Sequence, residues 1–495
     1  MAIPEYDDLD AIGLANAVRK GDASPRELLD AAAERIESRN PALNAVVFDM
    51  VERARAKADA LPDGPLKGVP FLVKDLKLKI AGTPTSNSSR LSRDVLATKS
   101  SVLAERYEAA GLQILGKTNT PEFGIMGITE PALRGPCRNP WSTEHTPGGS
   151  SGGSASAVAS RMVPIAHSGD GGGSIRIPAS ACGLFGLKPT RGRVTMAPFM
   201  GEAWGGFVQE HVVSRSVRDS ALLLDIEAVD TPGEPYVAPA KARPWLQEVG
   251  TDPGKLRIGF TEESLYAGDA HPDCRAAVHD AVKLLQELGH EVVPATPSFD
   301  RDKLVHAYFL TVATGVARFV DTTSADAGRR CRASDYEPAT WLMAQIGWST
   351  TAPELLAAQQ DMHAAGRSVA AFFGDYDLFL SSTLGRPPGR IGEVAPTSAE
   401  LAQLALLRTV NLKPLLRIAL GKVGDSKLVY SPNTQLFNQT GHPGMSVPLH
   451  WNSDGLPIGV QFGARFGDEA TLFRLAAQLE VARPWADKKP PMLAE

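Results

Sequence analysis

Two glycine clusters lie close together in the stretch from Pro147 to Thr190. The first reads GGSSGG around Ser150 and Ser151, and the second reads GDGGG and leads into Ser174. Glycine costs backbone entropy on folding, so two clusters in one short stretch need a compensating reason. Hydrophobic segments follow each cluster, which is not typical of a flexible linker. The pattern therefore predicts bare backbone whose successive amide N–H groups face a negatively charged oxygen.

That oxygen could belong to a phosphate or to the oxyanion of acyl transfer. The glycine clusters themselves spell neither G-x-x-x-x-G-K-[ST] nor G-x-G-x-x-G after a strand, the two common phosphate-binding patterns. Acyl transfer needs a serine nucleophile and a base in addition to the amides. Ser174 stands at the end of the second run of amides, where a nucleophile is needed. The clusters therefore favour acyl transfer.

The stretch resembles the amidase signature family, whose members use a Ser–cis-Ser–Lys triad. The family's G-G-S-S-G-G-S block is present unchanged at residues 148–154, and its G-T-D-x-G-G-S-I-R block is matched at residues 169–176, with Gly169 in place of the threonine. The family's G-V-P-x-x-x-K-D block is GVPFLVKD, residues 68–75. Further matching blocks, in the family's order, are residues 116–124, 186–194, 437–448 and 454–461. The resemblance covers most of the chain.

The resemblance implies catalytic or supporting roles for several residues of these blocks. Ser174 is expected to be the nucleophile, Ser150 the proton relay after a cis Gly149–Ser150 bond, and Lys74 the base. The candidate oxyanion-hole donors are the amides of Gly171, Gly172, Gly173 and Ser174. Supporting roles fall to Ser151, Asp170 and Arg176, of which the last two are expected to orient the loop.

Lys74 must be neutral to accept a proton. A free lysine has a pKa of about 10.4, and burial lowers that value because it disfavours the ammonium form. The apolar neighbours Phe71, Leu72 and Val73 predict that the segment before Lys74 is buried. We therefore expect a lowered pKa and an alkaline-leaning rate profile.

Another serine chemistry stays open at this point. Residues 148–152 also satisfy G-x-S-x-G, the nucleophile elbow of α/β-hydrolases, with Ser150 as the nucleophile. An elbow follows a strand directly, whereas residues 138–147 are typical of a loop. It also needs a histidine, and nothing in the sequence singles out His442 or His450. We assign no catalytic role to His145 or His167, which flank the clusters.

Strands alternating with helices predict an α/β fold. Ser24 is a natural N-cap and Glu27 completes a capping box, which predicts a helix over residues 24–39. Further expected helices are residues 101–110, 154–161, 272–289 and much of 303–373. Expected strands are residues 69–73, 113–115, 163–166, 255–260, 291–294 and 377–381, with a hairpin at 445–462. We expect one domain over residues 1–495, with a mixed central sheet covered by helices on both faces. The signature core would be about 68–194 and the variable pocket region about 196–350.

Composition narrows the class of protein. The chain has 495 residues, 43% hydrophobic and 22% charged, which is ordinary for a globular enzyme. The net charge of -5 argues against general nucleic-acid binding. The four cysteines form no C-x-x-C pair, and no spacing of histidines or acidic residues predicts a metal site. We expect no cofactor and no membrane segment, and a cytoplasmic location. A homodimer is left open.

The substrate is the least constrained feature. Within the family the chain resembles the 6-aminohexanoate-cyclic-dimer hydrolases, for example in RNPWS at residues 138–142 and IRIPASACG at residues 175–183. Pocket walls are expected from residues 196–207 and 303–348. Their aromatic residues are Phe199, Trp204, Phe207, Tyr308, Phe309, Trp341 and Trp348. We expect an apolar amide, anilide or carbamate as the small-molecule substrate. The alternative is the amidase component of a glutamyl-tRNA amidotransferase, which acts inside a complex.

Overall fold

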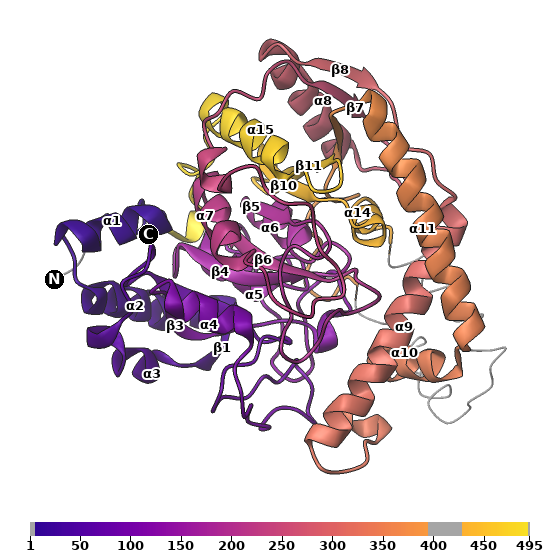
Figure 1. Cartoon of the computed structure of the whole chain (residues 1–495). Helices are drawn as coiled ribbons and strands as arrows, with labels where there is room; N and C mark the ends of the chain where they lie inside the picture. The colour runs from indigo at the N-terminus through magenta and orange to yellow at the C-terminus, as the bar shows by residue number, and fades with distance from the viewer. Residues whose placement is uncertain (1–4, 395–427, 494–495) are drawn as a thin grey trace.

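The computed structural model describes residues 5–394 and 428–493. An 11-stranded mixed sheet runs through its centre in the order β1-β3-β2-β4-β6-β5-β10-β11-β9-β7-β8 (Figure 1). The strands are β1 (Val46–Asp49), β2 (Pro70–Lys74), β3 (Gln113–Thr118), β4 (Ile165–Asp170), β5 (Phe185–Lys188), β6 (Gln209–Ser214), β7 (Arg257–Phe260), β8 (Glu291–Pro294), β9 (Leu378–Ser382), β10 (Gly444–Trp451) and β11 (Pro457–Ala464). The predicted α/β fold with a mixed sheet is confirmed.

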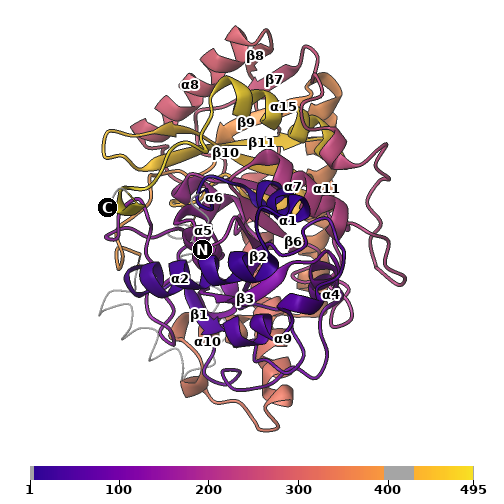
Figure 2. The same cartoon turned by 90° about the vertical axis from the view of Figure 1, so that its left-hand side faces the viewer.

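Helices cover the sheet, and three long ones form a separate layer beside it. The helices are α1 (Ala11–Lys20), α2 (Pro25–Leu43), α3 (Val51–Arg55), α4 (Val102–Ala109), α5 (Gly152–Ala159), α6 (Arg176–Cys182), α7 (Val217–Glu227), α8 (Pro272–Glu287), α9 (Arg301–Asp326), α10 (Pro338–Ser349), α11 (Ala352–Asp375), α14 (Gln435–Thr440) and α15 (Glu469–Ala482). Helices α10 and α11 both pack on α9 at the right of Figure 1, and α14 contacts α9 and α11. Figure 2 shows the sheet running from β1 near the bottom to β8 near the top.

The parallel strands at one side of the sheet bring the family blocks together. Strand β2 pairs in parallel with both β3 and β4, whereas β4 pairs antiparallel with β6. Lys74 is the last residue of β2 and Asp170 the last of β4. Because the carboxyl ends of parallel strands meet at one edge, both residues reach the place where ligands bind in open α/β sheets.

Some helices and strands were predicted correctly because local sequence signals mark them, and others were missed because they lack such signals. The capping box of Ser24 and Glu27 is present, and it begins α2 as predicted. Strands β5 and β6 were not predicted, because every residue in them is buried and no polar alternation marks them. The expected strand at 163–166 is β4, Ile165–Asp170, so it begins two residues later and continues four residues further than predicted.

One match to a phosphate-binding pattern lies outside the glycine clusters, at residues 111–118, GLQILGKT. Most of this segment is the buried strand β3 and not a loop before a helix. The Lys117 ammonium is buried and donates to Thr85 Oγ1 at 2.8 Å. The segment therefore lacks the strand–loop–helix context of a phosphate-binding loop.

Candidate active site

Lys74 and Ser150 lie in direct contact. Lys74 Nζ is 2.8 Å from Ser150 Oγ and 3.2 Å from the carbonyl oxygen of Gly169. The Lys74 residue is 1% exposed, and so is Ser150. The Gly149–Ser150 peptide bond is cis, as the resemblance implies. A lysine and a serine expected to exchange a proton are thus within hydrogen-bonding distance.

The surroundings of Lys74 lower its proton affinity. Burial lowers the pKa of Lys74 from 10.5 to about 7, and the nearby positive charge of Lys77 acts in the same direction. The negative charges of Glu210 and Asp170 oppose the change. At neutral pH a large share of Lys74 is therefore the neutral amine that a base requires.

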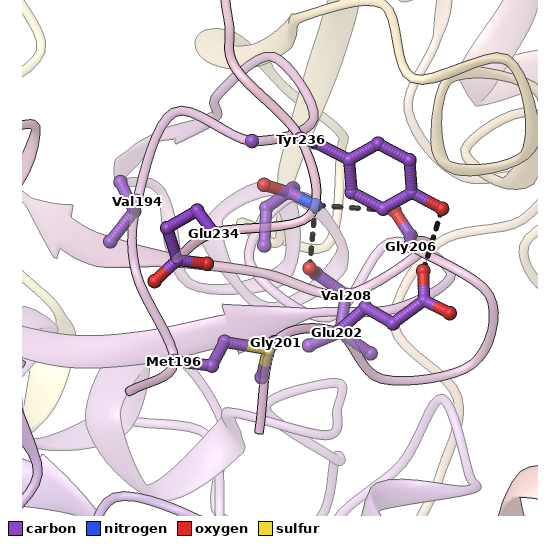
Figure 3. Close-up of a pocket in the computed structure, with 10 residues that line it drawn as sticks. Val194, Met196, Gly201, Glu202, Gly206, Val208, Glu234 and Tyr236 are labelled. Atoms are coloured by element: carbon purple, nitrogen blue, oxygen red, sulfur yellow. Dashed lines mark hydrogen bonds between the residues drawn. The ribbon is translucent and has the colours of Figure 1, made fainter. Parts of the chain in front are cut away.

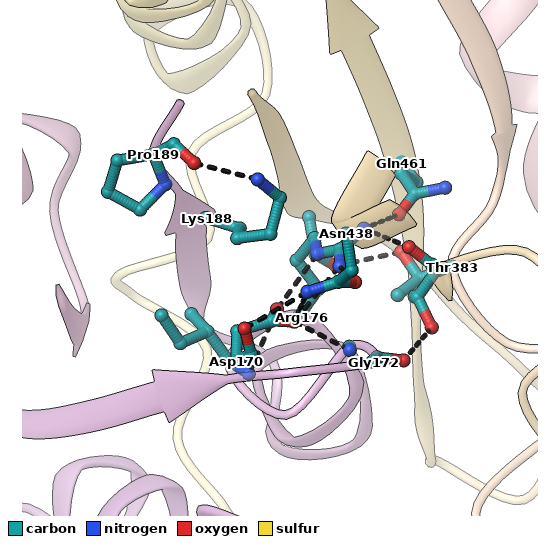
Figure 4. A network of polar contacts seen from close by, with 12 residues as sticks. Asp170, Gly172, Arg176, Lys188, Pro189, Thr383, Asn438 and Gln461 are labelled. Carbon is teal, nitrogen blue, oxygen red and sulfur yellow. Dashed lines mark hydrogen bonds and ion pairs between the residues drawn. The ribbon is translucent and has the colours of Figure 1, made fainter. Parts of the chain in front are cut away.

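Asp170 organises the loop that leads to Ser174. Its carboxylate accepts hydrogen bonds from the amide N–H of Gly173 at 2.6 Å and of Ile175 at 3.2 Å. Arg176 donates to both carboxylate oxygens, at 2.9 and 3.0 Å, and neither side chain has any exposed surface (Figure 4). Although burial raises the pKa of Asp170, the charge and hydrogen bonds of Arg176 outweigh it and hold the pKa at about 2. The pair therefore stays ionised and fixes the loop.

Residues from the C-terminal part of the chain form further hydrogen bonds with the same loop and with Arg176. Arg176 donates to Gln461 Oε1 at 2.7 Å and to Asn438 Oδ1 at 2.6 Å (Figure 4). Asn438 Nδ2 donates to Asp170 Oδ1 at 2.8 Å, and Thr434 Oγ1 donates to the carbonyl of Gly172 at 2.6 Å. Asn438 and Gln461 lie in the blocks 437–448 and 454–461, for which no role was predicted.

The four predicted oxyanion donors are not equivalent. The amide of Gly173 is already bonded to Asp170. The amides of Gly171, Gly172 and Ser174 donate to no acceptor among residues 5–394 and 428–493, although all three residues are buried. Buried backbone N–H groups without a partner are rare in proteins, and they point to a bound anion or oxyanion. The amide of Gly173 therefore does not fit the expected set, and the amides of Gly171, Gly172 and Ser174 stay the predicted donors.

Aromatic side chains lie against the loop at Gly171 and Gly172. A Cβ atom at Gly171 would lie 2.7 Å from the Trp204 ring, and one at Gly172 would lie 2.0 Å from Tyr308 Oη. Phe207 stacks on Tyr308 with ring centroids 5.7 Å apart. Glycine is therefore required here by close approach of these rings.

The other aromatic residues expected in the walls are more distant from the loop. Phe309 packs edge-on against Tyr308, and Trp341 contacts Trp348. Phe199 and Trp348 are 38% and 43% exposed. Phe123, which was not predicted, packs against Phe319 of α9.

A surface pocket lies next to the segment that carries Trp204 and Phe207 (Figure 3). It is lined by Gly192, Val194, Met196, Gly201, Glu202, Gly206, Val208, Gln209, Glu234 and Tyr236. It contains none of Lys74, Ser150 or Ser174. Val208 lines this pocket and also lies close to the loop, since a Cβ atom at Gly171 would lie 3.0 Å from its Cγ2 atom. The predicted wall segment 196–207 therefore lines a pocket beside the loop.

The remaining candidates have structural partners. Ser151 Oγ lies 3.4 Å from both the amide and the carbonyl of Gly169. His145 Nδ1 contacts Ser142, and His442 Nδ1 contacts Thr440, each at 3.0 Å or less. Within the described ranges Ser150 contacts a lysine and no histidine. The elbow chemistry therefore lacks its base at Ser150.

His167 and Glu210 lie near the base. His167 was assigned no catalytic role from the sequence, and Glu210 was not predicted. The Lys74 amide donates to His167 Nδ1 at 3.3 Å, and His167 Nε2 lies 3.1 Å from Glu210 Oε2. No motif contains Glu210, so no sequence signal marked it.

In residues 5–394 and 428–493, no cluster of three or more histidine, cysteine, aspartate or glutamate side chains has a geometry that could hold a metal ion. In the same residues no helix has the length and apolar character needed to cross a membrane.

Comparison with known proteins gives consistent matches over the whole chain. The family model described as Amidase matches residues 27–473. The 6-aminohexanoate-cyclic-dimer hydrolase of Pseudomonas sp. (strain NK87) is 36% identical over 491 residues, covering 98% of this chain and 97% of that protein. A solved 6-aminohexanoate cyclic dimer hydrolase has a TM-score of 0.90 at 34% identity, covering 98% and 99%.

More distant structures share the same architecture. A bacterial aryl acylamidase of the amidase signature enzymes has a TM-score of 0.85 at 26% identity, covering 97% of this chain and 98% of its own. The glutamyl-tRNA(Gln) amidotransferase component solved from Thermotoga maritima has a TM-score of 0.72 at 24% identity, covering 98% and 97%. The last match is a likeness of fold.

Proposed function

This chain belongs to the amidase family of hydrolases, which cleave carbon–nitrogen bonds of amides, and we propose that it does so with Ser174, Ser150 and Lys74 through an acyl-enzyme. The observation that carries the proposal is the contact of a buried lysine with Ser150, Nζ to Oγ 2.8 Å, beside three amides that have no partner among the described residues. A base, a relay and an oxyanion site are what acyl transfer from an amide requires.

Acylation begins with attack of Ser174 Oγ on the amide carbonyl carbon. The proton of Ser174 passes to Ser150 Oγ, and the proton of Ser150 passes to the neutral amine of Lys74. The negative charge that develops on the carbonyl oxygen is stabilised by the amides of Gly171, Gly172 and Ser174. One such donor typically contributes about 2.7–4 kcal/mol of transition-state stabilisation.

Collapse of the tetrahedral intermediate then expels the amine. Its nitrogen takes a proton from Ser150, which regains one from the Lys74 ammonium, so both groups return to their starting states. Water attacks the ester of Ser174 by the same route, with its proton passing through Ser150 to Lys74. The carboxylic acid leaves as Ser174 Oγ takes a proton from Ser150, which regains one from the Lys74 ammonium, so all three residues return to their starting states.

The substrate that we propose is a small apolar amide, such as a cyclic or linear amide of an ω-amino acid or an anilide. Trp204, Tyr308 and Phe207 supply an apolar wall against the loop that carries the oxyanion amides. The names of the relatives, a hydrolase of a cyclic dimer and an aryl acylamidase, belong to the same chemical class. We also propose that residues 68–194 carry the chemistry and residues 196–350 much of the pocket wall.

The test uses the purified chain alone with a matched set of amide, anilide, ester and carbamate substrates. We expect hydrolysis of an apolar amide or anilide without any partner protein. Lys74→Ala and Lys74→Arg should each lose most amide activity, because arginine keeps a charge that is not lost near neutral pH. Esters should suffer less, since an alkoxide needs a delivered proton less than an amine does. A Lys74→Arg variant that kept a large share of amide activity would refute the relay.

The amidotransferase alternative has a different outcome in the same experiment. A protein of that class would release little product alone and would need its complex. The cytoplasmic location and the homodimer stay predictions, which cell fractionation and light scattering of the purified chain would test.

A further inference from the structure

Glu210 is a buried acidic side chain beside the base that the mechanism does not use. It lies in β6 directly opposite Gly169 of β4. The residue is 6% exposed. Its Oε2 atom lies 3.1 Å from His167 Nε2, and His167 Nδ1 accepts the backbone N–H of Lys74 at 3.3 Å. A chain of polar contacts therefore joins Glu210 to the residue that carries the base.

Because Gly169 has no side chain, the Glu210 carboxylate can occupy the space beside it. A Cβ atom at Gly169 would lie 2.3 Å from Glu210 Oε2 and 3.0 Å from its Cδ. Any side chain here would have to displace the carboxylate. This is the position at which the chain departs from the family pattern, with glycine in place of threonine. The carbonyl of the same residue accepts a hydrogen bond from Lys74 Nζ at 3.2 Å. The carboxylate is thus packed against the backbone that contacts the base.

Asp170, Lys77 and His167 are the charged or titratable groups that act on the base or on Glu210. Asp170 is paired with the buried guanidinium of Arg176 at 2.9 Å, so its charge is already matched. Lys77 places a second ammonium nearby, over the Trp204 ring at 5.1 Å. Burial lowers the pKa of Lys77 to about 8, and Glu210 opposes that change.

The same groups act on Glu210 in return. Burial raises the pKa of Glu210, but its contact with His167 and the charges of Lys77 and Lys74 outweigh this effect and lower the pKa. Glu210 is therefore an ionised carboxylate, and it faces Lys74, Lys77 and His167 without an arginine partner among the described residues.

We propose that Glu210 is a positioning residue for the base, seated in the space left by Gly169, and that its charge stabilises the ammonium that Lys74 forms during acylation. Its carboxylate also lies 3.1 Å from His167 Nε2, on the ring whose Nδ1 accepts the Lys74 amide, so it helps to position the end of β2. A lysine buried without such a carboxylate would hold a proton too weakly to take it from Ser150. This inference rests on the proposed role of Lys74 as the base.

The charge is tested with Glu210→Gln, which keeps the shape of the side chain. Loss of the carboxylate should move the acidic limb of kcat/KM to lower pH by about one unit, the low end of the effect of a nearby opposite charge. From a pKa of about 7, the neutral fraction of Lys74 at about pH 6 would then rise from roughly one tenth to roughly one half. Relative to its own plateau, the variant should thus be about fivefold more active there.

Two variants serve as matched controls. Glu210→Asp keeps a charge and should keep the limb near its original pH. Glu227→Gln removes another buried carboxylate that contacts a histidine ring, that of His211, and should leave the limb in place. The proposal would be overturned if the acidic limb of kcat/KM lay at the same pH in wild type and Glu210→Gln. It would also be overturned if the limb of Glu210→Gln lay at higher pH.

The packing is tested with Gly169→Ala. This variant should lower the unfolding temperature because its methyl group meets the carboxylate, and Gly169→Ala combined with Glu210→Ala should recover most of the loss. The double variant also lacks the carboxylate, so the acidic limb of its kcat/KM profile should lie at lower pH than that of wild type. It therefore serves as the test of the charge if Glu210→Gln does not fold. A double variant no more stable than Gly169→Ala would overturn the pairing.

A readout independent of activity separates this proposal from the proposed function. NMR titration of lysines labelled at the ε carbon, with the Lys74 signal assigned by its loss in Lys74→Met, reports the base directly. If wild type fails to hydrolyse amides, the proposed function fails, whereas the titration still decides whether Glu210 acts on Lys74.

Discussion

Replacing the buried lysine with methionine should stabilise the protein near neutral pH while abolishing amide hydrolysis. The folded-state pKa of Lys74 is about 7, against 10.5 for the ordinary group. Between these two values the unfolded chain binds more protons at this residue than the folded chain does, so wild-type stability rises with pH across this window. Lys74→Met has no proton to lose and lacks this dependence.

The magnitude follows from the same two values. At about pH 7 the burial of this lysine costs the folded protein roughly 4 kcal/mol, because the unfolded lysine is fully protonated. The variant gives up the hydrogen bonds of Lys74 to Ser150 and Gly169, at about 1 kcal/mol each. We therefore expect a net gain of about 2 kcal/mol. At about pH 9.5 the cost falls to roughly 1.5 kcal/mol, and the gain should vanish or reverse.

The assay is equilibrium unfolding in urea, followed by tryptophan fluorescence, at both pH values for wild type and Lys74→Met. Lys283→Met is the control, because the Lys283 side chain is 77% exposed, and it should change stability by less than about 0.5 kcal/mol at either pH. The reasoning would be refuted if the difference between wild type and Lys74→Met were the same at both pH values.

Three further changes test other parts of the site. Asp170→Asn leaves Arg176 as an unmatched buried charge, so it should cost about 3–5 kcal/mol in unfolding experiments, and an unchanged stability would contradict the role of the pair. Gly172→Ala forces the new methyl group against Tyr308 Oη and should reduce kcat at least about 100-fold, as loss of one oxyanion donor does; near-normal turnover would exclude this amide from the site. The proposed chemistry uses protein groups alone, so activity should survive exhaustive treatment with EDTA, and a loss restored by zinc or magnesium would reveal a metal site.

The family blocks were sufficient to predict the fold and the contact between Lys74 and Ser150. Lys74 and Ser150 are 76 positions apart in the sequence. No local pattern relates them, and the resemblance alone predicted their proximity. The helix after Ser24 and the hairpin of β10 and β11 were predicted from capping and turn chemistry, which act locally.

The parts that the sequence did not predict depend on contacts between distant segments. The bond from Gly173 to Asp170 depends on the turn geometry of the loop, so glycine spacing alone gave four equal donors. Thr434 and Glu210 approach the loop from α14 and β6 and carry no motif of their own. Aromatic composition likewise did not separate Trp204 and Tyr308, which lie against the loop, from Phe199, which is exposed.

Covalent labelling of the nucleophile tests the central claim most directly. A serine-directed fluorophosphonate should inactivate the enzyme, and mass spectrometry of the digested protein should place a single adduct on Ser174. Ser174→Ala should abolish both the adduct and amide hydrolysis. An adduct on Ser150 or Ser151, with Ser174→Ala still active, would contradict the account.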